Sequence, residues 1–361
     1  MIYLDHAATT PICEAAKRAI IEHLDDYGNP SSSHEFGRKS RVLIEDARER
    51  IAKCINAKPD EIYFTSSGSE ANTMALYDKF SCSSCFEHHS VKASVNLFSV
   101  NSNGFVSPKN IAAVLDEDEN YYSRASCMFV NNELGTIQPI KTIASITHKF
   151  GTLLHVDAVQ AVGHIPVDVK DINCDLLSSS GHKFGAPKGA GFLYAKYRGC
   201  FNPVINGGKQ ENGLRPGTEN ILGIISMAAA LEDSVEHMEE RNEHIKHLRD
   251  MLLDKLLQIP GSHLNGSLEN RVVSNINIRF DGVSGSRLVA LCSLYDICIS
   301  SGSACNEGTP EPSHVLKAIG LSDKDALSSI RITLGHENTI EEIEQAATII
   351  TKLVERIRED E

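Results

Sequence analysis

The chain has 361 residues, of which 41% are hydrophobic, so it is long enough for two packed units with a sizeable core. Its formal net charge of −13 argues against non-specific binding of nucleic acid. No apolar run approaches the roughly 18 residues that a membrane span needs, and the first residues do not read as a signal peptide. We therefore expect a cytoplasmic protein that binds neither membrane nor nucleic acid directly.

The elements predicted in the first two thirds of the chain alternate between helix and strand. Residues 37–55 carry apolar side chains at helical spacing. Short apolar strands are predicted at residues 61–64, 126–130, 153–157, 175–180 and 191–195. Alternation of this kind indicates an α/β unit built on a mostly parallel sheet.

The last third of the chain has a different pattern, which begins with one long predicted helix over residues 219–259. After it the pattern predicts a strand at 272–280, a helix at 286–295, a strand at 297–300 and a final helix. These elements indicate a second, smaller α+β unit. We place the boundary between the units inside the long helix, near residue 239.

Ten cysteines are present, and in a long chain without an export signal we expect them to be reduced thiols. Cys82 and Cys85 form a C-x-x-C pair. Such pairs bind zinc or carry out redox chemistry, but no second cysteine or histidine pair at zinc-finger spacing accompanies this one. We interpret the two as ordinary thiols at a strand edge, and we predict no metal site.

The loop after the strand at 61–64 reads Ser66-Ser67-Gly68-Ser69 and leads into a helix. Free backbone N–H groups and hydroxyls at a helix start can hold a phosphate group. The loop has neither the Walker spacing nor the dinucleotide-binding spacing of glycines. By itself, a Ser-Gly loop of this kind is more often a plain turn.

Asp157 ends the predicted strand 153–157, and Gln160 follows it. Ligands gather at the carboxyl edge of a parallel sheet. A buried carboxylate needs a cationic or hydrogen-bonding partner, and a protonated pyridine nitrogen would serve. The alternative is that Asp157 caps the helix that follows.

Lys183 stands just after the strand at 175–180, in the stretch "SSSGHKFGAPKG". A lysine in a turn is most often simply exposed. Pyridoxal 5'-phosphate, however, needs a lysine, an acid beside its ring nitrogen and a phosphate site. His88 or His89 could supply a flat group over the ring. The combination of these features predicts a pyridoxal-phosphate site.

The chain resembles the cysteine desulfurases, in the NifS/IscS-like branch of the class V aminotransferase family. The resemblance runs almost end to end, through the blocks "YLDHAATTP", "YGNPSSSHEFGR", "FTSSGSEAN", "EHHSV", "NNELGTIQPI", "HVDAVQAVG", "SGHKFGAPKGAG", "RPGTEN", "SGSAC" and "EPSHVLKAIGL". It implies the type I fold of pyridoxal-phosphate-dependent transferases. Residues 13–239 would form the large cofactor-binding domain, and residues 1–12 with 240–361 the small α+β domain that carries the catalytic cysteine loop.

The resemblance also implies a role for each matching residue. Lys183 would hold the cofactor covalently and move the substrate α-proton, His88 would stack on the ring and assist proton transfer, and Cys305 would accept the sulfur. The residues expected to bind the cofactor are Gly68, Ser69, His88, Asn132, Asp157, Gln160, Ser180, His182, Lys183 and Thr218. Thr218 would reach the phosphate of the other subunit, which implies a homodimer. The substrate would be held by Asn29, Asn132 and Arg331, whose fork suits a carboxylate.

The implied reaction removes sulfur from L-cysteine, giving L-alanine and a persulfide on Cys305. An acceptor protein would then receive the sulfur for iron–sulfur cluster assembly or thiolation. The alternatives are selenocysteine lyase, another class V enzyme, and a non-catalytic scaffold that binds partners. Cys305 favours the sulfur reaction, and the presence of both Lys183 and Cys305 argues against a scaffold.

The sequence departs from the family pattern at a few places. The segments 70–88 and 88–131 look shorter than in typical members. Ala186 stands where a glycine is usual, and Asn212 where an arginine is usual. None of these is an expected catalytic position, but Asn212 puts contacts with partners or at the dimer rim in doubt.

Overall fold

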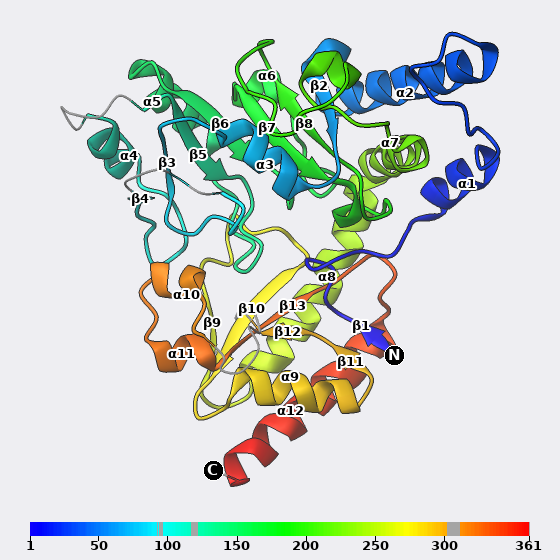
Figure 1. Cartoon of the computed structure of the whole chain (residues 1–361). Coiled ribbons are helices and arrows are strands. Elements are labelled where there is room, and N and C mark those ends of the chain that lie inside the picture. The colour runs from blue at the N-terminus through cyan, green and yellow to red at the C-terminus, as the bar shows by residue number, and fades with distance from the viewer. Residues whose placement is uncertain (92, 94–96, 117–121, 302–310, 361) are drawn as a thin grey trace.

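The computed structural model describes residues 1–91, 93, 97–116, 122–301 and 311–360. These residues form a large unit around a seven-stranded sheet and a smaller unit around a four-stranded sheet, one beside the other (Figure 1). In the described part of the chain, no helix combines the length and the apolar character needed to cross a membrane.

The large sheet is mixed, with one strand reversed. Its strands, in spatial order, are β2 (Ile62–Thr65), β8 (Gly191–Ala195), β7 (Leu176–Ser180), β6 (Leu153–Asp157), β5 (Arg124–Met128), β3 (Ser81–Ser84) and β4 (Leu97–Phe98). Only β8 pairs antiparallel with its neighbours within this described sheet. The connection from β7 to β8, residues 181–190, is too short for a parallel crossover. The predicted mostly parallel sheet is therefore confirmed.

Helices cover both faces of this sheet. They are α1 (Glu14–Glu22), α2 (Glu35–Cys54), α3 (Gly68–Leu76), α4 (Pro108–Leu115), α5 (Ile140–Lys149), α6 (Val169–Ile172) and α7 (Ile221–Glu236), with 3-10 turns η1 (Pro59–Glu61), η2 (Gly181–Lys183) and η3 (Gln210–Gly213). Leu176 packs in a cluster with Met74 of α3, whereas the next residue, Leu177, packs in the cluster of Ile44 of α2 and Leu231 of α7. Successive strand residues point to opposite faces, so α3 and the α2–α7 pair lie on opposite sides.

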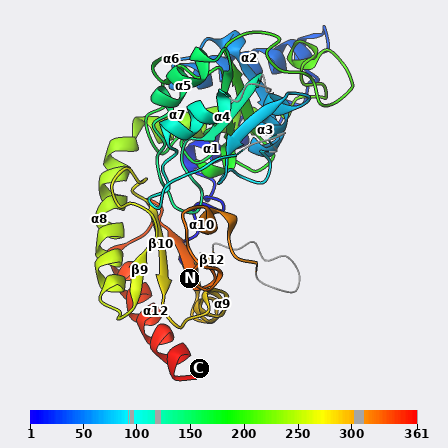
Figure 2. The ribbon, with the colours of Figure 1, turned by 90° about the vertical axis from the view of Figure 1, so that its left-hand side faces the viewer.

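The long helix predicted over residues 219–259 is wrong: the structure has two helices, α7 and α8 (Met238–Leu257), which meet at His237. Helix α7 is mostly buried in the large unit, whereas α8 buries only one side. Helix α8 then runs along the small unit (Figure 2). The break lies where the chain leaves one core for the other. The domain boundary at residues 239–240, just beyond this break, stays a prediction.

The small unit combines both ends of the chain. Its sheet contains β12 (Ser300–Ser301), β13 (Ser329–Thr333), β10 (Asn275–Phe280) and β9 (Ser262–Leu264), and β1 (Ile2–Tyr3) pairs with β11 (Ile297–Cys298). Its other helices are α9 (Gly285–Leu294), α10 (His314–Ala318), α11 (Asp323–Leu327) and α12 (Ile340–Asp360). Pairing of β1 with β11 brings the N-terminus onto this unit. The segment of α10 and α11 nevertheless places apolar residues in the large unit's core: Val315, Leu316, Ile319 and Ala326.

A fully buried histidine, His155, joins three strands of the large sheet. Its Nδ1 lies 2.8 Å from Ser126 Oγ on β5, and its Nε2 lies 2.9 Å from Ser178 Oγ on β7. Burial lowers the pKa of His155 to about 3. In the folded protein the ring of His155 therefore stays neutral at pH values where the unfolded chain binds a proton there, that is, below the ordinary histidine pKa of about 6.5. The contribution of the buried neutral ring to the free energy of unfolding is fully present above about pH 6.5. It is lost as the pH falls below that value.

We expect that His155→Gln makes the free energy of unfolding less sensitive to acid. Between pH 7.5 and pH 5, the stability advantage of the wild type over this variant should shrink by about 2 kcal/mol. Urea unfolding at a series of pH values measures this difference. His247→Gln, at an exposed position of α8, is the control and should follow the wild type. Equal acid sensitivity of His155→Gln and wild type would contradict the prediction.

Candidate active site

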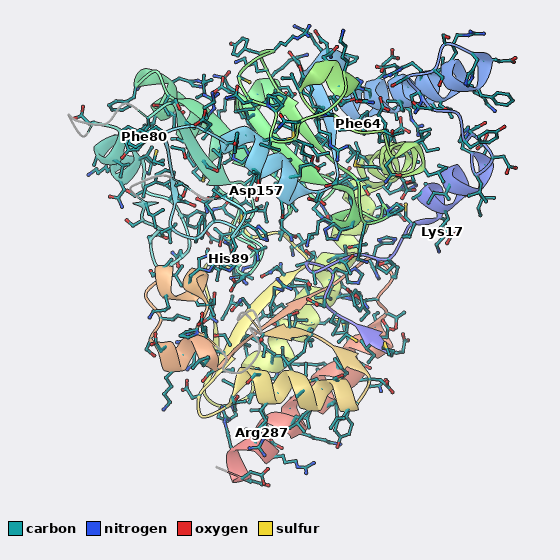
Figure 3. The ribbon with its side chains drawn as sticks, viewed as in Figure 1. Lys17, Phe64, Phe80, His89, Asp157 and Arg287 are labelled. Carbon is teal, nitrogen blue, oxygen red and sulfur yellow. The ribbon has the colours of Figure 1, made fainter. Side chains whose placement is uncertain are left out.

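A cavity of about 310 Å³ lies at the carboxyl ends of β5, β6 and β7. The N-terminal segment, through Ala7 and Ala8, and β13, through Arg331, complete its wall. Figure 3 labels Asp157 in the large unit and His89 nearer the small unit. The structure brings ten of the predicted site residues to this one cavity: Gly68, Ser69, His88, Asn132, Asp157, Gln160, Ser180, His182, Lys183 and Arg331.

Asp157 is the last residue of β6, and its carboxylate is almost completely buried. Its Oδ1 accepts the backbone N–H of Val159 at 3.0 Å, so it does cap the chain that follows. Its Oδ2 accepts the side-chain amide of Asn72 at 2.7 Å. Burial raises the pKa of Asp157, and the charges of His88 and Lys183 oppose this rise. A carboxylate with so few donors has capacity for a further cationic N–H group.

Lys183 ends the turn η2 that follows β7, the strand next to β6. Its ammonium donates to the carbonyl oxygens of Ala7 at 2.6 Å and of Ala8 at 2.9 Å. Burial, helped by the positive charge of Arg331, lowers the pKa of Lys183 to about 8. A larger fraction of this amine is thus neutral and nucleophilic near neutral pH than in an exposed lysine.

The serine–glycine loop begins helix α3, with Ser67 as its N-cap. The start of this helix lies close to the segment that follows β6. A Cβ atom on Gly68 would stand only 2.5 Å from Val159 Cγ2. Ser180 and His182 face the same cavity. Burial lowers the pKa of His182 to about 4, so its ring is neutral. Free N–H groups of the helix start and these neutral donors suit an anion such as a phosphate.

Arg331 reaches the cavity from β13 of the small unit. One of its terminal nitrogens donates to the carbonyl oxygen of Asn132 at 3.0 Å, and the other lies 2.8 Å from Asp5 Oδ1. Its Nε is buried and has no hydrogen-bond partner in the described part of the chain. This nitrogen therefore has an unused hydrogen-bond donor.

His88 lines the cavity, with its Nδ1 held by Ser90 through the side chain at 2.7 Å and the backbone N–H at 3.1 Å. Burial lowers the pKa of the His88 ring. Gln160 donates to the carbonyl oxygen of Ala7 at 2.9 Å, which is one of the two oxygens that hold Lys183. Both predicted residues thus line the cavity.

Two of the predicted residues that the structure describes do not line the cavity. Asn29 and Thr218 are exposed elsewhere on the large unit, and Thr218 lines a separate surface pocket near Ser66. Cys305 lies outside the described residues. The roles predicted for these three residues stay predictions.

Two cavity neighbours were missed by the reasoning from the sequence. Asn72 lies on the buried face of α3 with Ala71 and Ala75, so its spacing within an apolar stripe was a signal that could have revealed it. Asp5 precedes the segment that contacts Lys183 and pairs with Arg331. No local pattern marks Asp5, because its partner is far away in the sequence.

The departures from the family pattern have local explanations. Ala186 is buried and is not among the residues with positive φ, so its backbone conformation does not demand glycine. Asn212 is exposed with φ of +57°, a conformation that asparagine adopts more readily than arginine. Cys82 and Cys85 form no disulfide, and burial raises the pKa of Cys82 to about 12, as expected of an inert thiol.

Known proteins resemble this chain over nearly its whole length. The model of the aminotransferase class-V family matches residues 2–346. The cysteine desulfurase IscS of Dictyoglomus turgidum is 40% identical over 378 residues, covering 99% of this chain and 95% of that protein. A solved structure of a NifS-like protein from Rickettsia africae has 34% identity and a TM-score of 0.90, covering 99% of both chains. The structure of SspA in complex with cysteine has 32% identity and a TM-score of 0.80, covering 94% of this chain and all of the other.

Proposed function

Because the chain belongs to the class-V aminotransferase family, with IscS and NifS-like relatives along almost its full length, we propose that it is a pyridoxal-phosphate-dependent cysteine desulfurase. One observation carries this proposal: Lys183, Asp157 and Arg331 converge on a single cavity. Relatives named cysteine desulfurase favour this activity over selenocysteine lyase or a scaffold. The product would be L-alanine, with the sulfur transferred to the enzyme.

The residues at the cavity fit pyridoxal phosphate. Asp157 has capacity for a protonated ring nitrogen, and the close approach at Gly68, with Ser69, Ser180 and His182, suits the phosphate. When bound, the cofactor supplies an electron sink that stabilises negative charge on the α-carbon of an amino acid. We propose that residues 13–239 hold it and that the small unit, residues 1–12 with 240–361, supplies Arg331 and Cys305.

The chain's own groups would handle the substrate and its protons. Arg331 would bind the carboxylate of L-cysteine through its unpaired Nε and through the nitrogen that now contacts Asp5. Lys183, with its pKa lowered to about 8, would take and return the α-proton. His88 would lie over the cofactor ring and assist proton transfer, and Asn132 and Gln160 would contact its ring oxygen.

The sulfur would leave the substrate through Cys305. The thiolate of Cys305 would attack the substrate sulfur, and the carbon–sulfur bond would break while the new sulfur–sulfur bond forms. Protonation of the carbon then yields alanine, and Cys305 keeps the sulfur as a persulfide. An acceptor protein would take this sulfur for iron–sulfur cluster assembly or thiolation, in the cytoplasm.

The direct test is incubation of the protein with L-cysteine, pyridoxal phosphate and a thiol reductant. We expect alanine and sulfide in equal amounts, measured by amino-acid analysis and a sulfide assay. Formation of pyruvate and ammonia, or no product, would overturn the proposal. L-Selenocysteine as a parallel substrate separates this activity from a dedicated lyase, which should release little alanine from L-cysteine.

Arg331→Lys should weaken substrate binding. A lysine presents no fork to the carboxylate, so KM for L-cysteine should rise roughly ten- to hundredfold, the factor for one lost charged hydrogen bond of about 1.5–3 kcal/mol. The value of kcat should change less. Arg279→Lys, on the neighbouring strand β10 and bonded to Asn265, is the control and should keep the wild-type KM. An unchanged KM in Arg331→Lys would contradict the role of Arg331.

We propose a homodimer in which Thr218 reaches the phosphate site of the partner subunit. In support, Thr218 is exposed and does not line its own subunit's cavity, and large apolar side chains are exposed at Ile21 of α1, at Phe36 of α2 and at Tyr27 between the two helices. Light scattering should give about twice the chain mass of 39.4 kDa. A monomer that binds pyridoxal phosphate fully would contradict this prediction.

A further inference from the structure

A chain of hydrogen bonds runs from Asp157 to His88 through two residues with no role in the function proposed above, Asn72 and Ser90. The Nδ2 of Asn72 lies 2.7 Å from Asp157 Oδ2 and 2.9 Å from Ser90 Oγ. The Ser90 Oγ in turn lies 2.7 Å from His88 Nδ1. The end of β6, helix α3 and the segment after β3 are thereby connected along the cavity wall.

The chemistry of the groups sets the direction of each hydrogen bond. As a carboxylate, Asp157 can only accept, so Asn72 must donate to it. The reversed amide would place its carbonyl oxygen against the carboxylate. The second amide proton of Asn72 then goes to Ser90 Oγ, and the hydroxyl proton of Ser90 is directed to His88 Nδ1.

The His88 Nδ1 is thus an acceptor on two counts, because the backbone N–H of Ser90 also points to it at 3.1 Å. A ring nitrogen that accepts from two donors carries no proton of its own, so the proton of the neutral ring is on Nε2. No hydrogen bond from a described residue reaches Nε2. That nitrogen is free to act on a ligand.

Asn72 is buried, so its side-chain amide needs hydrogen-bond partners. It is 1% exposed on an otherwise apolar face of α3, and its own carbonyl oxygen has no partner within the described residues. A buried amide is costly unless it is hydrogen-bonded. The two hydrogen bonds that Asn72 donates therefore offset the cost of burying its amide.

We propose that Ser90 is a positioning residue that keeps His88 neutral with its proton on Nε2, and that Asn72 aligns the Ser90 hydroxyl for this purpose. The inference rests on the proposed function only in that His88 acts beside the cofactor. A hydrogen bond to the neutral form of a base disfavours its protonation. The Asp157–Asn72–Ser90 chain would thus couple the residue expected beside the cofactor's ring nitrogen to the residue expected over the ring.

Other charged groups also act on His88 and must be held constant. Besides burial, the positive charge of Lys183 disfavours its protonation, as do the neighbouring rings of His89 and His314, and Asp157 favours it. The rings of His89 and His314 lie 4.8 Å apart beside it. A substitution at Ser90 changes none of these charges, so a change in the pKa of His88 reports on the lost hydrogen bond.

The test is nuclear magnetic resonance of the full-length, cofactor-loaded protein with ¹⁵N-labelled histidine. The His88 signals are identified by their loss in His88→Gln. We expect an unprotonated Nδ1 and a protonated Nε2. In Ser90→Ala the pKa of His88 should rise by roughly half a unit, about threefold in its protonation constant. The acidic limb of kcat/KM for alanine release should move upward by the same amount.

Two further variants distinguish loss of the Ser90 hydrogen bond from a general disturbance of the structure around His88. Ser90→Thr keeps the hydroxyl and should restore the wild-type pKa of His88. Ser179→Ala removes a buried hydroxyl of β7 that has no partner in the described structure, and it should leave that pKa unchanged.

A proton found on Nδ1 in the wild type would overturn the inference, as would equal pKa values of His88 in Ser90→Ala and Ser179→Ala. Absence of alanine release from the wild type, together with the expected spectra, would overturn the proposed function and support the tautomer assignment. The two proposals therefore fail through different measurements.

Discussion

Lys183→Ala is expected to abolish covalent attachment of pyridoxal phosphate and to lower alanine release by about a thousandfold or more. The variant loses both the amine that holds the cofactor and the base that moves the α-proton. Borohydride reduction of the wild type, followed by peptide mapping, should place the cofactor on the peptide containing Lys183. The visible absorption of the bound cofactor should disappear upon this reduction.

The matched control for this prediction is Lys188→Ala, five residues further along and exposed to solvent. It should keep the colour and the activity of the wild type. Cofactor mapped to a lysine other than Lys183 would show that the site is assigned wrongly. The depressed pKa of Lys183 also predicts that its amine forms the covalent bond at lower pH than an ordinary lysine would.

Cys305→Ala should bind the cofactor and L-cysteine normally but release alanine about a thousandfold more slowly. A methyl group cannot attack sulfur, so the reaction should stop before the carbon–sulfur bond breaks. Cys305→Ser should behave in the same way because a hydroxyl is a poor sulfur acceptor. Mass spectrometry of wild type treated with L-cysteine should find one extra sulfur on the peptide containing Cys305.

The other nine cysteines should be dispensable for turnover, and the structure gives a physical reason for most of them. Burial raises the pKa of Cys54 to about 11 and that of Cys82 and Cys292 to about 12. Thiols so rarely ionised are weak nucleophiles near neutral pH. Cys85→Ala is the control variant and should turn over normally. Extra sulfur on Cys82 or Cys85, with wild-type turnover in Cys305→Ala, would refute the assignment.

Much of the fold followed from local sequence patterns. The strands β6 and β8 agree with the predicted ranges 153–157 and 191–195, because runs of apolar residues bounded by turns are local signals. The break at His237 was not predicted. Apolar periodicity continues across it, and only the passage of the chain from one core to the other ends α7 there.

By itself, the sequence determined which side chains stand at the strand ends, namely Asp157 and Lys183, and so determined the class of cofactor to expect. Residues next to a strand end need no tertiary contact to be recognised. Only the tertiary structure decided that Arg331 pairs with Asp5 and that Asn72 joins Asp157 to Ser90. These partners are far apart in the chain, and hydrogen bonds over such separations arise only when the sheet edge, helix α3 and the N-terminal segment pack together.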